Sequence, residues 1–374
     1  MLEIKLLRNK EIKKYILMAF ILLILSRIIM ALVAFYNKSE LPFYKIINQW
    51  DSGWYFKIAQ NGYEVLPEIT NGNLNYVSWA FFPLYPLLIR IVNTIVPIDI
   101  SIISYILSNL FTYISMIFST LYLIDTKREN VIYLFYFTLL FGPYCFYFSS
   151  TYTESLFIML LAMALYYSNQ KQWIKVGVVC GLLSATKTVG VLFFFCILGK
   201  MICEENGNIF YRIREILNDG KKMLALFLCP SGLFCYMTYL YYHTGDVFAF
   251  VHAQRGWARR NELPWNIIRE GLNSPQLIMK ILTIFTIFRI LLIVYSIYKK
   301  RYSESFIMSY LILPGLFSGI LSIPRYIVGS LVFYFNVSEI LSKFKLLKYA
   351  VCIFSFLLGI FMIYFWYLSF EYFI

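Results

Sequence analysis

Apolar residues occur in long, continuous blocks along this chain, and this pattern limits the possible folds more than any other feature. The chain has 374 residues, of which 60% are hydrophobic and 14% are charged, whereas soluble domains are about half apolar and about a quarter charged. Runs of about 20 apolar residues can cross a bilayer as helices, and continuous runs differ from the alternating pattern of a membrane β-barrel. The sequence therefore predicts an all-α integral membrane protein.

The number and spacing of the runs predict a polytopic helical bundle with about 9–11 membrane segments. The apolar runs cover approximately residues 15–36, 79–97, 101–124, 131–148, 152–169, 173–200, 222–243, 276–298, 304–323, 325–341 and 347–372. Two long polar segments, about 37–78 and 243–275, are expected to form external loops. With no long linker, low-complexity tract or internal repeat, residues 1–374 are expected to form a single transmembrane domain.

The basic residues set the expected orientation. The net charge is +13, and the basic residues cluster in short segments between apolar runs, as is typical of cytoplasmic loops. They are therefore expected to face anionic membrane lipids rather than nucleic acid. The N-terminus carries five of them and is expected to be cytoplasmic: Lys5, Arg8, Lys10, Lys13 and Lys14. Lys127 and Arg128 lie outside if all four runs between residues 79 and 169 cross the membrane, and inside if one run crosses only partly.

No cofactor-binding pattern is present in the sequence. The seven cysteines form no CxxC pair, and with only two histidines they give no zinc-type site. The glycines form no phosphate-binding loop and no dinucleotide fingerprint. The external loops contain no paired-acid motif such as Asp-x-Asp, so no cofactor is expected, although a divalent metal ion stays an open alternative. Because no external segment is long enough to fold around a nucleotide-sugar, an activated donor is expected to come from the membrane itself.

Asp51 is the first candidate for chemistry, in the run Trp50-Asp51-Ser52-Gly53-Trp54-Tyr55 just after the first apolar run. It can act as a general base or a charge-stabilising carboxylate at the outer membrane surface. Alternatively, it caps a helix that begins near Ser52. The aromatic residues Trp50, Trp54 and Tyr55 can stack on a sugar, or they can belong to the aromatic belt found at membrane interfaces.

Arg325 and Lys187 are cations within or beside apolar runs. Arg325 follows Pro324 between two such runs, where an arginine is costly unless it is paired. Its planar guanidinium suits a phosphate group; the alternative is a side chain that snorkels to the interface. Lys187 lies where residues 184–190 interrupt a run, which predicts a broken or re-entrant helix lining a cavity.

Lys187 is expected to bind an anion or to pair with a buried acid. Glu154, in Tyr152-Thr153-Glu154-Ser155, is the candidate partner, or it is an ordinary acidic residue in the first turn of a helix. In the second loop, Gln254 and Arg255 bring polar and cationic groups together, with Arg259 and Arg260 close behind. The alternative for this loop is a basic surface that touches lipid headgroups.

These stretches resemble, in the same order, the motifs of the PIG-V type mannosyltransferases, a family that includes GPI mannosyltransferase II. The first motif is Trp50–Tyr55 with Ile58-Ala59 and Gly62-Tyr63. The others are Phe81-Phe82-Pro83-Leu84-Tyr85-Pro86, Tyr152-Thr153-Glu154-Ser155-Leu156-Phe157, Ala185-Thr186-Lys187 with Gly190, and Arg325-Tyr326. The resemblance runs from about residue 15 to about residue 345.

The resemblance implies a GT-C type membrane glycosyltransferase that uses a polyprenyl- or dolichyl-phosphate mannose donor. Transfer takes place on the external or lumenal face and inverts the anomeric centre. By analogy Asp51 deprotonates the acceptor hydroxyl, and the donor phosphate is held by Arg325, Lys187 and Arg255. The residues expected to contact substrate are Trp50, Trp54, Tyr55, Glu154, Gln254 and Tyr326.

The chain also departs from the family pattern. Lys187 stands where an arginine is expected, which weakens two-point phosphate binding. The composition, rich in Ile, Lys, Asn and Tyr, indicates a prokaryotic plasma-membrane protein. A GPI acceptor is then not expected, and another lipid-linked or glycan acceptor takes its place, with mannose as the default sugar.

Two other classes of function are compatible with these residues. One is a transporter or flippase for an anionic lipid or a lipid-linked sugar, with Lys187 and Arg325 lining the path. The other is a non-catalytic subunit of a membrane complex, in which Asp51 would be dispensable. The long external loop that carries Asp51 and the lack of an internal repeat favour the enzyme, because transporters more often place ionisable residues near the membrane midplane between repeats.

Overall fold

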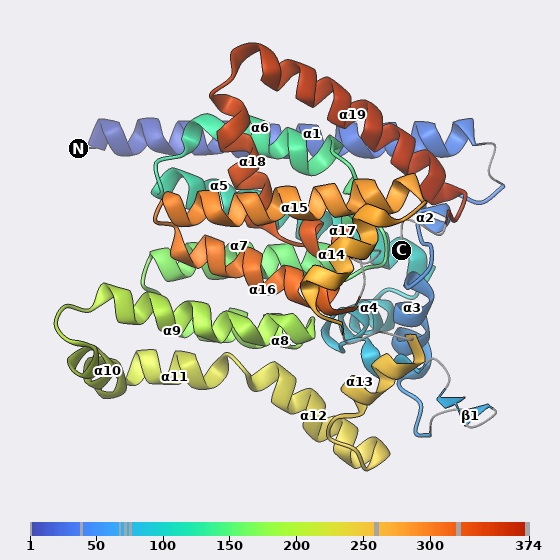
Figure 1. Cartoon of the computed structure of the whole chain (residues 1–374), viewed down its shortest axis with the longest axis horizontal. Coiled ribbons are helices and arrows are strands. Elements are labelled where there is room, and N and C mark those ends of the chain that lie inside the picture. Colours follow the sequence, from blue (N-terminus) through green and yellow to red (C-terminus); the bar gives the residue numbers. More distant parts are fainter. Residues whose placement is uncertain are drawn as a thin grey trace.

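The computed structural model describes residues 2–37, 40–66, 69–70, 73–74, 77–257, 262–318 and 323–370. Most of the longer helices lie side by side along one axis (Figure 1). The first half of the chain forms α1 (Leu2–Tyr36), α2 (Phe43–Ile46), α3 (Ser52–Asn61), η1 (Ser78–Ala80), α4 (Leu84–Ile95), α5 (Ile100–Asp125), η2 (Glu129–Val131), α6 (Ile132–Phe141), η3 (Cys145–Phe148), α7 (Glu154–Asn169) and α8 (Trp173–Ser184). Two short strands, β1 (Ile69–Thr70) and β2 (Asn73–Leu74), pair antiparallel in the first loop.

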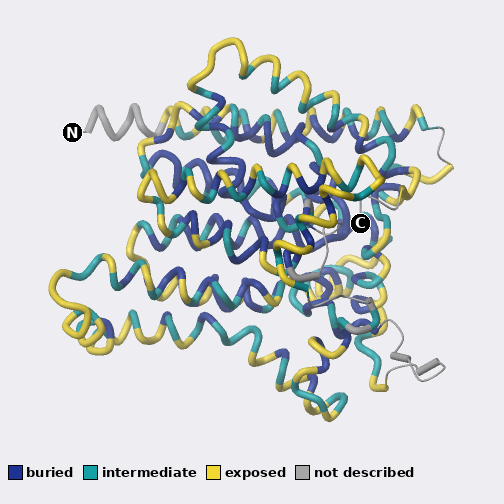
Figure 2. Tube along the Cα trace, viewed as in Figure 1, coloured by how far each residue is buried: buried dark blue, intermediate teal, exposed yellow. Residues whose placement is uncertain are grey.

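The second half of the chain is also helical. It forms η4 (Thr188–Leu192), α9 (Phe193–Glu204), α10 (Ile209–Asn218), α11 (Gly220–Leu228), α12 (Ser231–Thr244), α13 (Ala249–His252), η5 (Ala253–Trp257), α14 (Pro264–Asn273), α15 (Leu277–Tyr298), α16 (Tyr302–Ser318), α17 (Ile323–Val328), α18 (Leu331–Ser342) and α19 (Lys345–Tyr367). The predicted all-α membrane fold is confirmed. Buried residues concentrate on the inner helices, whereas α19 and α10 to α12 expose much of their surface (Figure 2).

Several of the expected membrane segments are shorter than a full span. Among the described residues, four helices are long and apolar enough to cross a membrane alone, and the bent pair α11–α12 gives a fifth if it is one span. The run at 79–97 contains only the 12-residue α4, which lies beside α3 at one end of the bundle (Figure 1). The run at 325–341 is not one segment, because the chain leaves helical geometry at Gly329-Ser330 between α17 and α18. The predicted break near Lys187 is confirmed between α8 and η4.

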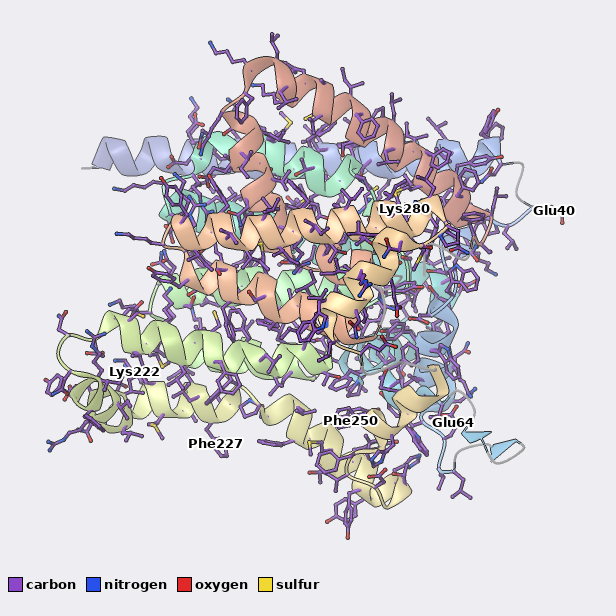
Figure 3. The ribbon with its side chains drawn as sticks, in the orientation of Figure 1. Glu40, Glu64, Lys222, Phe227, Phe250 and Lys280 are labelled. Carbon is purple, nitrogen blue, oxygen red and sulfur yellow. The ribbon has the colours of Figure 1, made fainter. Side chains whose placement is uncertain are left out.

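The two ends of the bundle differ in charge and in structure. Arg128 forms an ion pair with Glu304, in the first turn of α16, and Arg301 pairs with Glu339 at 2.5 Å. The Lys127-Arg128 turn therefore lies at the end that carries the loop at 299–301, and the partial crossing is α4. The helix N-terminus of α1 and Lys222 lie at this same end, whereas Glu64 and Phe250 lie at the opposite end (Figures 1 and 3). We call these the basic end and the loop end.

A stripe of hydroxyl residues joins α5 to α7 and holds the segment before α7 in place. The small buried residues on this face let the two helices approach closely: Ser104, Ser108, Thr112, Ser115 and Ser119. Ser108 donates to the carbonyl of Ser150 at 3.0 Å, and Thr112 donates to the carbonyl of Phe148 at 3.0 Å. The polar break at 149–153 is thus buried inside the protein, with its groups satisfied by neighbouring helices.

Candidate functional site

A cavity of about 370 Å³ opens at the loop end. Its walls come from seven parts of the chain: α3 with the residue before it, the η1 region, the residue before α7, the turn between α8 and η4, α13 with η5, α16, and α17. Six predicted site residues line it: Asp51, Tyr55, Lys187, Gln254, Arg325 and Tyr326. Both long loops and the broken helix therefore converge on one site.

Asp51 directs its carboxylate into this cavity. It occupies the N-cap position of α3, but its side chain accepts no hydrogen bond from the helix. Instead, Oδ2 lies 2.5 Å from Nη1 of Arg325, and the backbone N–H of Asp51 donates to the hydroxyl of Tyr152 at 3.1 Å. The helix-capping alternative does not account for this carboxylate, because the group is committed to an ion pair across the cavity.

Arg325 bridges two carboxylates. Besides Asp51, it donates from Nε to Oε1 of Glu154 at 2.6 Å, and its guanidinium carbon lies 4.7 Å from the centre of the Tyr152 ring. Stacking on an aromatic ring and bonding to carboxylates hold the planar group in one orientation. Its side chain is only 18% exposed, so this arginine does not snorkel to the surface.

Glu154 links the two cations of the site. Its side chain is fully buried, and the same Oε1 that bonds to Arg325 accepts from Nζ of Lys187 at 2.7 Å. The predicted pairing of Lys187 with Glu154 is confirmed. Two carboxylates and two cations thus lie together, so their charges balance, which offsets part of the cost of removing them from water.

The break that presents Lys187 depends on a close backbone approach. Gly190 lies on the first turn of η4, and a Cβ atom built there would be 2.2 Å from the carbonyl oxygen of Leu183. Only glycine fits at such a distance without movement of the backbone. The chain can therefore turn back on itself directly after α8, which places Lys187 against the N-terminus of α7.

The aromatic residues of the first loop divide into two groups. Tyr55 is buried and lines the cavity, with its hydroxyl 3.5 Å from Oγ1 of Thr153. Trp54 stacks on Phe81 at 5.6 Å between ring centres and does not line the cavity. Trp50 is 37% exposed with φ of 50° and also lies outside the lining. Contact of Trp50 and Trp54 with substrate stays a prediction.

The second loop closes one side of the cavity. Gln254 lines it together with Phe250, which packs edge-on against Phe82. Arg255 belongs to η5, but its side chain falls outside the described part of the structure, as do Arg259 and Arg260. The predicted phosphate contact of Arg255 therefore stays a prediction.

Glu64 fixes the part of the first loop that borders the cavity. It bonds to Lys57 and to the hydroxyl and backbone N–H of Ser78, and its own carbonyl accepts from Trp79 at 2.7 Å. Burial acts to raise the pKa of Glu64, but the hydrogen bonds from Lys57 and Ser78 outweigh it and keep that pKa below its usual value. The ionised carboxylate thus anchors η1, which leads into Phe81 and Phe82.

Sequence reasoning missed several residues that shape the site. Tyr152 stacks on Arg325, and Thr153, Thr186, Phe82 and Phe250 line the cavity. Four of them, Phe82, Tyr152, Thr153 and Thr186, lie in the motifs quoted above, but their residue types alone assign them no role; Phe250 lies in no motif. A stronger signal was overlooked at Arg289, a cation in the middle of the run at 276–298, because ionisable residues within membrane segments are rare and usually functional.

Comparison with known proteins gives matches in structure alone. No protein-family model and no curated protein matches this chain. Among solved structures, the Archaeoglobus fulgidus oligosaccharyltransferase in complex with zinc and sulfate matches with a TM-score of 0.50 and 12% identity, covering 94% of this chain and 53% of that chain. Its apo form matches with a TM-score of 0.51 and 11% identity, covering 93% of this chain and 55% of that chain.

The chain therefore shares its fold with the membrane-embedded Archaeoglobus fulgidus oligosaccharyltransferase structures that it matches. It spans about half the length of the oligosaccharyltransferase chains that it matches. At this level of identity the likeness shows the fold, and function has to be argued from the site. The resemblance to PIG-V type mannosyltransferases stays a prediction from the motifs.

Proposed function

We propose that this protein is a GT-C type glycosyltransferase that moves a hexose from a polyprenyl- or dolichyl-phosphate sugar to a lipid-linked or glycan acceptor. The observation that carries the proposal is the convergence of Asp51, Arg325 and Lys187 on one cavity at the end of a membrane bundle. A carboxylate and two cations are the groups that this reaction needs. Mannose is the default sugar, on the strength of the motif resemblance alone.

In the proposed reaction, the Asp51 carboxylate takes the proton of an acceptor hydroxyl as that oxygen attacks the anomeric carbon. The bond from the anomeric carbon to the phosphate oxygen breaks, and its electron pair stays on the phosphate. The configuration at the anomeric carbon is inverted by this single displacement. Arg325 and Lys187 stabilise the polyprenyl phosphate as its charge grows from about −1 to about −2, so their effect is largest in the transition state.

The ion pair between Asp51 and Arg325 also suggests how the base becomes available. While Arg325 is bonded to Asp51, its Nη1 occupies Oδ2 of the carboxylate, so this oxygen is not free to accept a proton from the acceptor hydroxyl. A donor phosphate that binds Arg325 competes for Nη1 and releases the carboxylate. Donor binding then precedes proton transfer from the acceptor.

The position of the site supports action on the external face. The cavity is lined by residues of the loop end, whereas the N-terminus of α1 and Lys222 lie at the opposite end (Figures 1 and 3). The positive-inside rule places such basic segments in the cytoplasm. In the proposed setting, a prokaryotic plasma membrane, donor and acceptor would both reach the site from the outer leaflet. A transporter is less well supported, because the ionisable cluster lies at one end of the bundle rather than near its middle.

We also propose that no resident metal ion is required. Both carboxylates of the site are already bonded to cations of the chain, and no group of three or more potential metal ligands gathers within the described residues. Arg325 and Lys187 supply the positive charge that a metal would otherwise bring. Full activity in the presence of EDTA is the expected result.

The decisive test compares Asp51→Asn with wild type in a transfer assay. Purified protein in detergent receives radiolabelled polyprenyl-phosphate mannose, with membrane lipid extract as the acceptor. Asp51→Asn keeps the shape of the side chain and removes the base, so label transfer should fall at least about 100-fold. Asp99→Asn is the matched control, because Asp99 also precedes a helix at the loop end, pairs with a lysine (Lys45, 2.8 Å), and lies outside the cavity.

The outcomes separate the possible functions. Transfer by wild type and Asp99→Asn, but not by Asp51→Asn, supports the proposed reaction and its base. Transfer by all three proteins rules out Asp51 as the base. If wild type transfers nothing, the same preparation is assayed for movement of the labelled lipid across vesicle membranes, and such movement would favour the transporter.

A further inference from the structure

Arg289 is a fully buried cation in the middle of α15. Its Nη1 donates to the backbone carbonyl of Tyr326 at 3.1 Å, and its Nη2 donates to the backbone carbonyl of Met308 at 2.9 Å. Its Nε has no hydrogen-bond partner among the described residues. A buried arginine held by backbone carbonyls alone is costly in a membrane segment, so it is expected to serve a specific purpose.

That purpose follows from the helix that Arg289 contacts. α17 has six residues and carries Arg325, and a helix this short is not stable by itself. The last carbonyls of a helix have no partner within the helix. Here the carbonyl of Arg325 accepts from Gly329 and that of Ile327 accepts from Ser330, while the carbonyl of Tyr326, between them, accepts from Arg289.

Arg289 therefore joins three helices at the back of the site. It starts from α15, holds the C-terminal turn of α17, and reaches the carbonyl of Met308 on α16. The bond to Tyr326 is made one residue away from Arg325, whose guanidinium faces Asp51 and Glu154. Rotation or translation of α17 would move this guanidinium directly, because the helix has no long span of its own to fix it.

A second arginine, Arg90, binds the C-terminal carbonyls of a short helix in the first loop. α3 has ten residues and begins directly after Asp51. Arg90 on α4 donates from Nε to the carbonyl of Ala59 at 2.6 Å and from Nη2 to the carbonyl of Ile58 at 3.0 Å. In both cases an arginine from a neighbouring helix binds carbonyls near the C-terminus of a short helix that carries a reacting group. Cations at helix C-termini also interact favourably with the helix dipole.

We infer that Arg289 is a positioning residue that acts through Arg325 to set the affinity for the donor phosphate. This inference rests on the proposed function. It assigns Arg289 no contact with substrate, since the residue lies behind α17 and does not line the cavity. The chemical group that it serves is the phosphate of a polyprenyl-phosphate donor.

The test measures donor and acceptor KM for Arg289→Met, which keeps the length of the side chain and removes its donors. Donor KM should rise at least about tenfold, while kcat and acceptor KM change by less than about threefold. Arg289→Lys keeps a cation and should restore donor KM to within about threefold of wild type. If Arg289→Met does not fold, Arg289→Gln takes its place; it removes the charge, and donor KM should again rise, by at least about threefold.

Arg27→Met is the matched control. Arg27 is likewise a buried arginine within a membrane helix, but its Nε bonds to Asn109 on α5 at 2.6 Å rather than to α17. Its loss should lower the melting temperature and leave donor KM unchanged. A purely structural role for Arg289 would give the same pattern as Arg27→Met, and donor KM within twofold of wild type in Arg289→Met would overturn the inference.

A double variant links Arg289 to Arg325. In an Arg325→Ala background, Arg289→Met should raise donor KM by less than about twofold, because the group that it positions is gone. Binding of polyprenyl phosphate, measured by the thermal shift of the purified protein, is recorded in parallel. If wild type binds polyprenyl phosphate but transfers no sugar, the proposed sugar or acceptor is wrong, and the thermal shifts of the Arg289 variants still test the inference. If wild type does not bind polyprenyl phosphate, both proposals are wrong.

Discussion

Glu154 is the residue whose charge the site can least do without. It is fully buried and accepts from both cations through one oxygen, while its Oε2 has no partner among the described residues. A buried pair is weak evidence for stability, but removal of one partner leaves the others uncompensated. Glu154 is thus needed to keep Lys187 and Arg325 together in the absence of substrate, when their mutual repulsion would otherwise separate them.

Glu154→Gln tests this role. The substitution keeps the shape of the side chain and leaves two cations facing only Asp51, so the free energy of unfolding should fall by about 3 kcal/mol. Polyprenyl phosphate should raise the melting temperature of the variant more than that of wild type, because its charge replaces the missing carboxylate. The measurement is thermal unfolding with and without this lipid.

The control for Glu154→Gln is Glu129→Gln. Glu129 is exposed in the turn before α6, and exposed carboxylates contribute little to stability. Its melting temperature should match that of wild type under both conditions. If Glu154→Gln also matched wild type, the charge balance described for the site would be wrong.

The sequence predicted individual residues of the site, but it predicted only one contact between them, that of Lys187 with Glu154. Arg325 and Lys187 stand out because a cation within or beside an apolar run is costly, and Glu154 is the candidate partner of Lys187 because it begins an apolar run. The contact of Asp51 with Arg325 joins residues that are 274 positions apart. Local patterns carry no information on such distant pairs.

The interrupted segment formed by α8, η4 and α9 is the element that most directly presents a site residue. It was predicted correctly as a broken helix, because a lysine and a glycine interrupt an otherwise apolar run. The division between α17 and α18 was not predicted, since residues 325–341 have no comparable polar interruption. Hydropathy thus located the membrane segments, but tertiary contacts such as that of Arg289 with Tyr326 determine where short helices end.

Gly190→Ala is expected to displace Lys187. The added Cβ would lie 2.2 Å from the carbonyl oxygen of Leu183, so η4 must move away from the end of α8. We expect a loss of about 1–3 kcal/mol in stability and at least tenfold weaker binding of the donor. Donor KM and thermal unfolding of the purified protein measure the two effects.

Gly199→Ala provides a control on the following helix. A Cβ at Gly199 meets no atom within 4 Å, and alanine is the better helix former by about 1 kcal/mol. This variant should be as stable as wild type or more stable, with normal donor KM. Equal donor KM for the two glycine variants would contradict the role assigned to the break.

In the molecule as a whole, the basic segments and the cavity lie at opposite ends of the helix bundle. At the basic end, buried Arg128 pairs with Glu304 of α16, and Arg301, directly before α16, pairs with Glu339 of α18. At the loop end, Trp366 of α19 donates to the carbonyl of Ile47 at 2.8 Å and packs against Tyr152. These contacts join the helices at both ends of the bundle, and the polar cavity lies at the loop end.

This separation leads to a prediction about orientation. If the basic end is cytoplasmic, a cysteine placed at Gln60 on α3 should react with a membrane-impermeant maleimide in intact cells, because Gln60 is exposed at the loop end. A cysteine at Lys221, exposed at the basic end beside Lys222 (Figure 3), should react only after lysis. Both variants are made after the native exposed cysteines, Cys203 and Cys235, are replaced by serine.

The two labelling results together distinguish an external site from a cytoplasmic one. Labelling of Gln60→Cys alone in intact cells places the cavity where lipid-linked sugars are presented outside, and donor access then needs no cytoplasmic nucleotide-sugar. Labelling of Lys221→Cys alone would reverse the orientation and place Asp51 and Arg325 in the cytoplasm. The charge distribution favours the first result, because moving the basic segments across the membrane would carry several lysines and arginines against the bias that the positive-inside rule describes.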